Sequence, residues 1–532
     1  MSPRTTGILL LVIAAGSAVF RLIGWSVPVF KLPDLAGEVA SDLTASLLRL
    51  LLLPFGVSMP PWSSGPGICG WIVRAILVLP AVRFIRMGSG AWPLTPMTRR
   101  KLQRFRSIRR GYVSFLVLLA LILLACMDNL LVGNRALIVR HEGRTWFPFA
   151  QGVIPANTFG GEGEADTDYR DLRDQFKSEG KGSWVLMPPV PYAPKLDSTE
   201  LKVELEERDG LLYLTGRTEP FNGRAYSSFR TKSSQKRQEW SVRRGMREGE
   251  MQGWDEGGEL VERGRFSNGQ RVAWSDIAEG KAATLNDAAS PGLKTIIYPP
   301  APPVMSHRHF LGTNSIGGDI IAILFGGLQQ AIVAVIFYLF FTLSIGITIG
   351  GTLGYFGGWI DLLGQRLIEI WSNLPFLFIV IIISSLVQPS LLILAFIISA
   401  FSWMSPTVYM RTAAYKEKAR DYVAAARLIG AGPARIIFNH VLPNAISTLV
   451  TLAPFMAAGI ITSLAALDFL GFGLAPEEPS WGRLLHEGTE NFNYPWIVAA
   501  AFTALASCLI LITFVGEAVR EAFDPKKYTT YQ

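Results

Sequence analysis

Long apolar runs separated by polar stretches dominate the second half of the chain, and one more precedes a long polar region. Each run approaches the roughly 20 consecutive apolar residues that a helix needs to cross a bilayer. The six runs lie at about 112–132, 330–354, 366–387, 391–410, 445–467 and 495–515. The pattern therefore predicts six membrane-spanning helices, with a short helix opening at 318–324 before the second of them.

Three other apolar runs come before the first of these six. The first is interrupted by Arg21 and lacks a small-residue cleavage site, which favours a retained span over a signal peptide. The second is short and carries Arg49, so it is suited to lie along the membrane interface, whereas the third is long enough to span. They lie at 7–30, 43–57 and 68–85. We therefore expect residues 1–98 to add about two N-terminal spans.

Basic residues predict which side of the membrane each loop faces. Residues 99–110, RRKLQRFRSIRR, contain no acid, and basic side chains also gather in 411–440 and in the tail at 519–532. Lys and Arg remain on the cytoplasmic side, and these three clusters fit one alternating topology. A nucleic-acid-binding arm is disfavoured because a span begins directly after the first cluster. The net charge of +8 thus reflects topology, and 133–317 and 468–494 are expected outside.

The region at 133–317 is polar and rich in Gly and Pro, with no run able to span. We expect a soluble insertion on the outer side, which is the periplasm in a two-membrane bacterium. Within 209–272, glycines and aromatic residues recur between strand-like pieces, which predicts consecutive β-hairpins. These hairpins resemble MORN-type repeats. Two roles are open for them: shielding or stiffening the outer face, or binding a specific partner.

A polar and basic segment at 421–444, DYVAAARLIGAGPARIIFNHVLPN, lies between two apolar runs. Three consecutive alanines favour a short helix, the Gly and Pro residues of 430–433 break it, and apolar residues restart an amphipathic helix at 436. Small residues let the backbone of a partner come close. The segment therefore predicts a cytoplasmic helix–turn–helix shaped for docking, with an ordinary inter-helix loop as the alternative.

Few residues offer chemistry. The three cysteines, Cys69, Cys126 and Cys508, lie in apolar runs without CxxC spacing, which is typical of packing residues. His307 and His309 have no clustered acid beside them in sequence, a pattern more typical of solvated histidines than of metal ligands. No GxxxxGK[ST] phosphate-binding loop occurs, so the chain is not expected to hydrolyse ATP. We assign no catalytic residue, no metal and no cofactor.

Several segments together resemble the inner-membrane permease subunits of ATP-binding-cassette importers for peptides. They are LGTNSIGGDI (311–320), GYFGGWIDLLGQRLIEIWSNLP (354–375), DYVAAARLIGAGPARIIFNHVLPNA (421–445), LDFLGFGL (467–474), PSWGRLL (479–485) and GEAVREAFDPK (516–526). They cover the six-span region almost from end to end. FSWMS (401–405) and RALIVRHEGRTWFPF (135–149) are most similar to the YejE-type branch, whose members import microcin C and oligopeptides.

The resemblance implies an α-helical polytopic protein of the bacterial inner membrane with a six-span type I importer permease core. Its first span lies in 99–132, and spans two to six lie in 318–518. It implies three partners: a second permease subunit, an ATPase with two domains, fused or separate, and a periplasmic peptide-binding protein. The loop at 411–444 corresponds to the coupling loop that docks in a groove of the ATPase. The residues of this chain that match the family's coupling positions are Asp421, Ala425, Ala426, Gly430 and Pro443.

One position departs from the family. Ala424 stands where many members have Glu, which weakens the expectation of a charge-assisted contact with the ATPase and leaves docking by shape. The extra N-terminal spans and the β-rich insertion lie outside the family pattern. The substrate-binding residues cannot be assigned from the sequence.

Two functions are consistent with these features. The first is ATP-driven peptide uptake, with this chain as a non-catalytic membrane subunit. The alternative is a membrane-anchored scaffold or receptor that works through its periplasmic β insertion. An intramembrane enzyme is disfavoured, because Asp361, Glu369 and Asp468 lie singly at span edges and form no paired-acid constellation.

Overall fold

The computed structural model describes residues 96–523, except for short stretches at 126, 128–129, 152, 162–165, 180–181, 196, 198–200, 215–218, 230–235, 256, 277–288, 298 and 387–389. The extra N-terminal spans and the end of the predicted tail therefore lie outside the described residues. The chain divides into two compact units, which are described separately below. Within the described residues, the first unit contains 96–172, 182–196 and 320–523, and the second contains 173–181 and 197–319.

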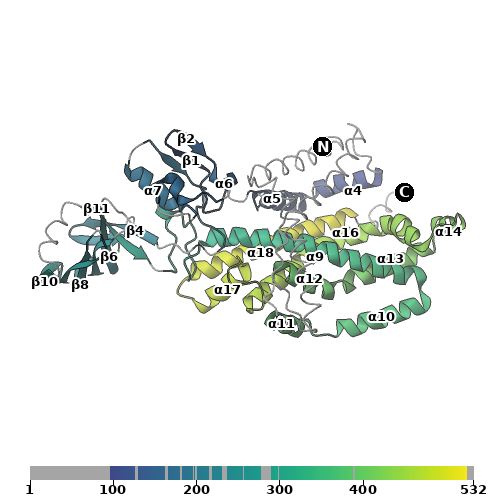
Figure 1. Ribbon diagram of the computed structural model, residues 1–532. Helices are drawn as coiled ribbons and strands as arrows, with labels where there is room; N and C mark the ends of the chain where they lie inside the picture. Colours follow the sequence, from purple (N-terminus) through teal and green to yellow (C-terminus); the bar gives the residue numbers. More distant parts are fainter. Residues whose placement is uncertain are drawn as a thin grey trace. The chain divides into compact units, whose positions relative to one another are not determined.

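The first unit is built mainly from apolar helices (Figure 1). Among the described residues, three helices are long and apolar enough to cross a membrane: α9 (Ile320–Phe356), the continuous helix Pro433–Phe469, and α18 (Pro495–Phe523). Three bent pairs raise the number of candidate spans to as many as six. These are α4 (Pro96–Ser107) with α5 (Arg109–Ala125) at 93°, α10 (Gly358–Ser372) with α11 (Phe376–Leu386) at 65°, and α12 (Leu391–Ser402) with α13 (Met404–Lys418) at 43°. The helical membrane fold agrees with the prediction, and the count of six stays a prediction.

Helix α9 corrects one predicted boundary. A short helix at 318–324 was expected to be separate from a span at 330–354, but a single helix of 37 residues runs through both. Gly326 and Gly327 lie within this continuous helix, and both are buried where it packs against other parts of the unit. A Cβ atom on Gly327 would lie 2.4 Å from Cδ1 of Trp481. These glycines are therefore needed for a close approach.

Three glycines spaced four residues apart let α9 lie directly against α13. A Cβ atom on Gly350 would lie 2.4 Å from the carbonyl oxygen of Thr407, and one on Gly354 would lie 2.3 Å from that of Arg411. Gly346 likewise faces Pro406 on the same helix. Small residues at this spacing allow backbones of membrane helices to pack closely. The pair α9–α13 thus forms a tight support for the loop that follows α13.

A small sheet in the first unit has the strand order β2-β1-β3. Its strands are β1 (Ile138–His141), β2 (Arg144–Trp146) and β3 (Trp184–Leu186), accompanied by α6 (Pro148–Gln151), η2 (Ala156–Phe159) and the start of α7 (Tyr169–Glu179). Phe159 is buried at its centre and contacts the rings of His141, Trp146 and Tyr169 edge-on. Burial raises the pKa of Tyr169 to about 12.

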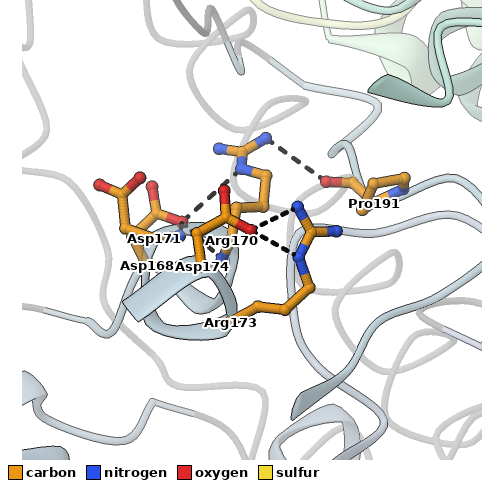
Figure 2. A network of polar contacts seen from close by, with 6 residues as sticks. All are labelled: Asp168, Arg170, Asp171, Arg173, Asp174 and Pro191. Atoms are coloured by element: carbon orange, nitrogen blue, oxygen red, sulfur yellow. Dashed lines mark hydrogen bonds and ion pairs between the residues drawn. The ribbon is translucent and has the colours of Figure 1, made fainter. Parts of the chain in front are cut away.

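Polar contacts fix the first turn of α7, as Figure 2 shows. Asp168 precedes the helix and accepts a hydrogen bond from the backbone N–H of Arg170 at 2.9 Å, which satisfies one of the free donors of the first turn. The Arg170 guanidinium donates to the carbonyl oxygen of Pro191 at 3.4 Å. Farther along the helix, Arg173 pairs with Asp174. The turn is thereby tied to the segment that follows β3.

The second unit is an antiparallel sheet of eight strands in the order β10-β9-β8-β7-β6-β11-β4-β5 (Figure 1). The strands are β4 (Leu201–Arg208), β5 (Leu211–Leu214), β6 (Gly223–Phe229), β7 (Lys236–Arg243), β8 (Met246–Trp254), β9 (Leu260–Ser267), β10 (Gln270–Asp276) and β11 (Ala289–Ile297). The predicted consecutive hairpins are confirmed from β6 to β10, where each strand pairs with the next. A buried cluster that includes Phe221, Trp240 and Met251 holds them together.

The sheet extends beyond the predicted interval of 209–272 on both sides. Strand β11 returns between β6 and β4, a long-range pairing that the local hairpin pattern does not indicate. Its last residue, Ile297, is the register partner of Leu201, the first residue of β4. The chain thus enters and leaves the sheet at neighbouring positions, as expected for a domain inserted into a loop.

The expectation of a solvated His309 is wrong. Its side chain is fully buried, and its Nδ1 lies 2.7 Å from Oδ2 of Asp319, which is fully buried too. The acid is ten residues away in sequence and is brought close by a turn, so sequence proximity could not reveal the pair. His307, at the end of η3 (Met305–His307), is half-buried, and burial lowers its pKa.

Candidate functional site

The segment at 421–444 folds as a helix, a turn and a second helix, which confirms the predicted local structure. Helix α14 (Asp421–Leu428) ends in a left-handed turn at Gly430, whose φ is +84°. Here the N–H of Ala431 donates to the carbonyl oxygen of Ala426 at 3.0 Å, and that of Gly430 donates to Arg427 at 2.9 Å. This double closure is a Schellman motif, for which Gly carries no steric penalty.

The chain restarts with Pro433 in the first turn of α15 (Pro433–Arg435). Proline suits this place because its ring presets the helical φ and its missing N–H has no partner there. One π-helical turn, η4 (Ile436–Val441), then leads into α16 (Leu442–Phe469). The turn between α14 and α15 is therefore defined by its own sequence and not by chance packing.

The predicted site residues do not form one patch. Asp421 and Ala425 are exposed one turn apart on α14, and Gly430 is exposed at the turn. Ala426 is buried at 5% exposure and serves packing. Pro443 is exposed but belongs to the first turn of α16. The structure thus brings three of the five to the open side of the α14 region.

Sequence reasoning missed two residues that stand out in the structure. Leu428 and Ile429, at the end of α14, are 90% and 86% exposed. We call these two side chains the apolar tip. Neighbouring large apolar side chains this open are unusual unless a partner covers them. The available signal was their position directly before Gly430, because a helix that ends there projects its last residues away from its own core.

The opposite side of α14 is packed into a buried cluster. Val423 and Ala426 supply its contacts from α14, and the remaining members come from α9, α13, η4 and α16. Those members are Tyr355, Met410, Ala414, Ile436, Ile437, Val441, Ala445 and Leu449. Close-packed interiors transmit displacement because they leave little free volume. We therefore expect α14 to move together with the adjoining ends of these helices.

Tyr355, in the last turn of α9, links this helix to α14. Nε of Arg427 donates to the Tyr355 hydroxyl at 3.2 Å, and the guanidinium lies 4.9 Å from the ring centroid. Nζ of Lys418 lies 6.0 Å from the same centroid and donates to the carbonyl oxygen of Phe356 at 3.2 Å. A cation above an aromatic face is attracted by the ring's electrons. Two basic residues thus hold the end of α9.

A second polar link joins α13, α14 and α16. The Tyr422 hydroxyl donates to Oε2 of Glu417 at 2.7 Å and accepts a hydrogen bond from Nδ2 of Asn444 at 3.0 Å. Burial, together with the hydrogen bond to Glu417, raises the pKa of Tyr422, so the hydroxyl keeps its proton near neutral pH. The tyrosine therefore acts as donor and acceptor at once, as the link requires.

Arg411 was predicted as a basic residue of the loop, but it lies within helix α13. Its guanidinium forms a two-pronged ion pair with Asp361 of α10, and Nη2 lies 2.6 Å from Oδ2. Paired bonds between guanidinium and carboxylate fix orientation as well as distance. Helix α10 is thereby attached to the same support as α14.

The predicted outer loop at 468–494 contains helix α17 (Trp481–Glu490) and a closed polar network. Asp468 is 7% exposed and accepts hydrogen bonds from the backbone N–H of Leu474 at 2.7 Å and from the Ser480 hydroxyl at 2.5 Å. Arg483 donates to the carbonyl oxygen of Pro476 at 2.6 Å. A cavity of about 30 Å³ lies beside this network, which is room for about one water and far too small for a peptide.

In the part of the chain that the structure describes, no three His, Cys, Asp or Glu side chains are grouped so that they could hold a metal ion. Cys508 is buried without a disulfide, in keeping with a packing residue. Cys69 and Cys126 lie outside the described residues.

Comparison with known proteins assigns the family. Residues 346–528 match the family of binding-protein-dependent transport system inner membrane components. The inner membrane ABC transporter permease protein YejE of Escherichia coli is 32% identical over 439 residues, which cover 82% of this chain and 98% of the relative. The chain belongs to the YejE-type peptide permeases. A peptidoglycan transport system permease protein YejE of Agrobacterium fabrum is 30% identical over 438 residues, or 81% of this chain and 94% of the relative.

More distant relatives match a shorter part of this permease. The oligopeptide transport system permease protein OppC of Haemophilus influenzae is 32% identical over 229 residues, which cover 42% of this chain and 73% of the relative. The alignments with the YejE proteins are almost twice as long, so they must extend outside the region at 318–532. The similarity to the YejE branch therefore includes residues before the main group of candidate spans.

Proposed function

We propose that this permease is one of two membrane subunits of an importer that carries peptides across the inner membrane of a bacterium, driven by ATP that a partner subunit hydrolyses. The observation that carries the proposal is the apolar tip, Leu428 and Ile429, projecting from a loop that is packed rigidly on its other side. Such a tip supplies a docking contact for a separate protein. Family membership makes an ATPase the expected partner.

The proposed topology has six core spans, with each bent helix pair counted as one. The loop at 411–444 then lies in the cytoplasm together with residues 99–110, and the β-sheet unit lies in the periplasm. A second permease subunit would complete the pathway, and a periplasmic binding protein would deliver the peptide. Oligopeptides and microcin C-like peptides are the substrate class. Since the Agrobacterium fabrum relative is named for peptidoglycan transport, peptides from cell-wall fragments are included.

Coupling follows from the contacts of α14. When ATP binding closes the two ATPase domains, the apolar tip follows the surface on which it is docked. Arg427 transfers this displacement to Tyr355 of α9, and Tyr422 transfers it to Glu417 of α13 and Asn444 of α16. The helices then rock between inward and outward openings, driven by the difference in binding energy between the two states.

The alternative, a scaffold or receptor working through the β-sheet, makes the opposite prediction about two deletions. Because Leu201 and Ile297 are register partners, residues 201–297 can be replaced by a Gly-Ser pair without stretching the chain. The matched second variant lacks residues 425–429. In cells with the partner subunits, transport predicts that peptide uptake survives the sheet deletion and is lost with the loop deletion. A scaffold predicts loss with the first and survival with the second, and that result would refute the proposal.

A further inference from the structure

Helix α4 carries a strongly basic surface that the transport mechanism does not use. Its sequence, PMTRRKLQRFRS, contains no acidic residue. Five of its side chains are basic, namely Arg99, Arg100, Lys101, Arg104 and Arg106. Within the part of the chain that the structure describes, neither Arg99 nor Arg106 forms an ion pair, and both are exposed. The helix therefore presents positive charge to its surroundings.

The direction of α4 places it along a membrane surface. It makes an angle of 93° with α5, the apolar helix that follows it. The 17 residues of α5 span about 25 Å, close to the thickness of the hydrocarbon core. If α5 crosses the bilayer, α4 lies nearly parallel to the interface at its cytoplasmic end, a placement that rests on the topology proposed above.

One side of α4 is anchored to α18. Phe105 is 8% exposed and packs with Ala518 and Ala522. Its ring also contacts the rings of Tyr112 and Phe115 of α5 edge-on, at centroid distances of 6.3 and 5.8 Å. This anchor fixes the rotation of α4 about its own axis. It therefore decides which of the other side chains face away from the protein.

Leu102 precedes Phe105 by three residues, so it borders the anchored side of the helix, and it is 46% exposed. Arg99 precedes it by three residues and Arg106 follows it by four, so that both flank it on the same face of the helix. An apolar side chain between two arginines matches the boundary between acyl chains and phosphate groups. Nucleic acid offers phosphates but no apolar layer for Leu102.

We propose that this face of α4 binds an anionic phospholipid of the cytoplasmic leaflet, with Arg99 and Arg106 on the phosphate and Leu102 against the acyl chains. Bound lipid would hold α4 at the interface and, through Phe105, the adjoining end of α18. The arginines suit this role because a planar guanidinium can bind two phosphate oxygens at once.

The test measures lipid binding to the purified full-length chain by native mass spectrometry, with phosphatidylglycerol and phosphatidylcholine titrated in parallel. Wild-type chain should retain phosphatidylglycerol more tightly. The double variant Arg99→Gln/Arg106→Gln should bind it about 25-fold more weakly, since each basic residue near an anionic surface contributes about fivefold. The matched control, Arg243→Gln/Arg265→Gln on exposed positions of the sheet, should bind as the wild type does.

A charge-keeping variant, Arg99→Lys/Arg106→Lys, separates loss of charge from loss of folding. It should bind phosphatidylglycerol more tightly than the glutamine variant, because the charge remains, and more weakly than wild type, because the paired guanidinium contacts are lost. Three results would overturn the proposal: equal binding of the two lipids, unchanged binding in the glutamine variant, or equally tight binding of inorganic phosphate or duplex DNA. None of these readouts depends on transport, so a failure here leaves the proposed function standing.

Discussion

The two ends of helix α16 differ. Its N-terminal end follows a loop in which Leu428 and Ile429 are exposed. At its C-terminal end, the loop that follows the helix folds over Asp468 and donates hydrogen bonds to its carboxylate. Both ends carry polar networks. At the first end these networks bind the loop to three helices but leave an apolar tip uncovered. At the second end, the donors around Asp468 point inward and hold the loop at 468–494 to itself.

The difference shows how one helix can serve two purposes. A polar network in which every donor and acceptor has a partner stabilises the fold, so removing one of its members lowers the free energy of unfolding. An uncovered apolar tip adds little to the stability of the free chain. It contributes binding free energy only when another protein covers it. Substitutions at the two ends should therefore affect different measurements.

The largest effect is expected from charging the apolar tip. Leu428→Asp with Ile429→Asp should weaken docking of the ATPase roughly 1000-fold, taking about 2 kcal/mol for each buried contact residue. Because both side chains are open in the chain itself, its thermal stability should stay within about 0.5 kcal/mol of wild type. Peptide uptake into vesicles that contain the whole complex reports the loss of ATPase docking. The control is Val153→Asp, an apolar position that is 62% exposed and distant in sequence.

The next effect concerns the other end. Asp468→Ala leaves the N–H of Leu474 and the hydroxyl of Ser480 without their acceptor and should cost about 3 kcal/mol of folding free energy. Heating the purified chain and following loss of the monodisperse fraction gives the shift in midpoint. Glu477→Ala, at an exposed position nearby, should leave the midpoint unchanged. Equal midpoints for the two variants would show that the closed network does not stabilise the loop.

A smaller effect is expected at the turn after α14. Gly430→Val places a β-branched side chain at φ +84° and should cost about 1–2 kcal/mol, which tilts the apolar tip or opens the Schellman motif. Uptake should fall several-fold while the chain remains inserted. Gly432 has a φ of −70° and open space around it, so Gly432→Ala is the matched control and should transport normally. Normal uptake in the valine variant would mean that the turn geometry is not required.

The smallest effect is expected from Tyr422→Phe. This change removes the hydrogen bonds to Glu417 and Asn444 but keeps the ring, so about 1 kcal/mol of the link between helices is lost. ATP hydrolysis should continue while uptake per ATP declines. Measuring both rates in the same vesicles checks this ratio, and an unchanged ratio would assign the coupling to Arg427 and Tyr355 alone.

Local sequence patterns predicted the helical membrane fold, the break at Gly430 and the consecutive hairpins, because each depends on neighbours along the chain. They could not predict the return of β11 between β6 and β4, since that pairing joins residues far apart in sequence. The His309–Asp319 pair was missed for a similar reason: only the fold of the turn brings the two together.

Some features of the candidate site could likewise be predicted from local sequence, and others could not. Alanine-rich composition located α14, and motif resemblance selected Ala425, Ala426 and Gly430. Whether a given side chain is buried depends on the helices packed beside it, so the sequence could not separate buried Ala426 from exposed Ala425. The apolar tip escaped notice for the opposite reason, because Leu and Ile in a helical pattern are usually core residues.

The central claim is that the apolar tip lies against the ATPase in the assembled importer. A cysteine at position 428, in a chain whose three native cysteines are replaced by serine, allows a short bifunctional cross-linker to test this directly. We predict a cross-linked product with the ATPase from Leu428→Cys and none from Val153→Cys. A functional complex in which the cysteine at 428 gives no product with the ATPase, while the one at 153 does, would contradict the account.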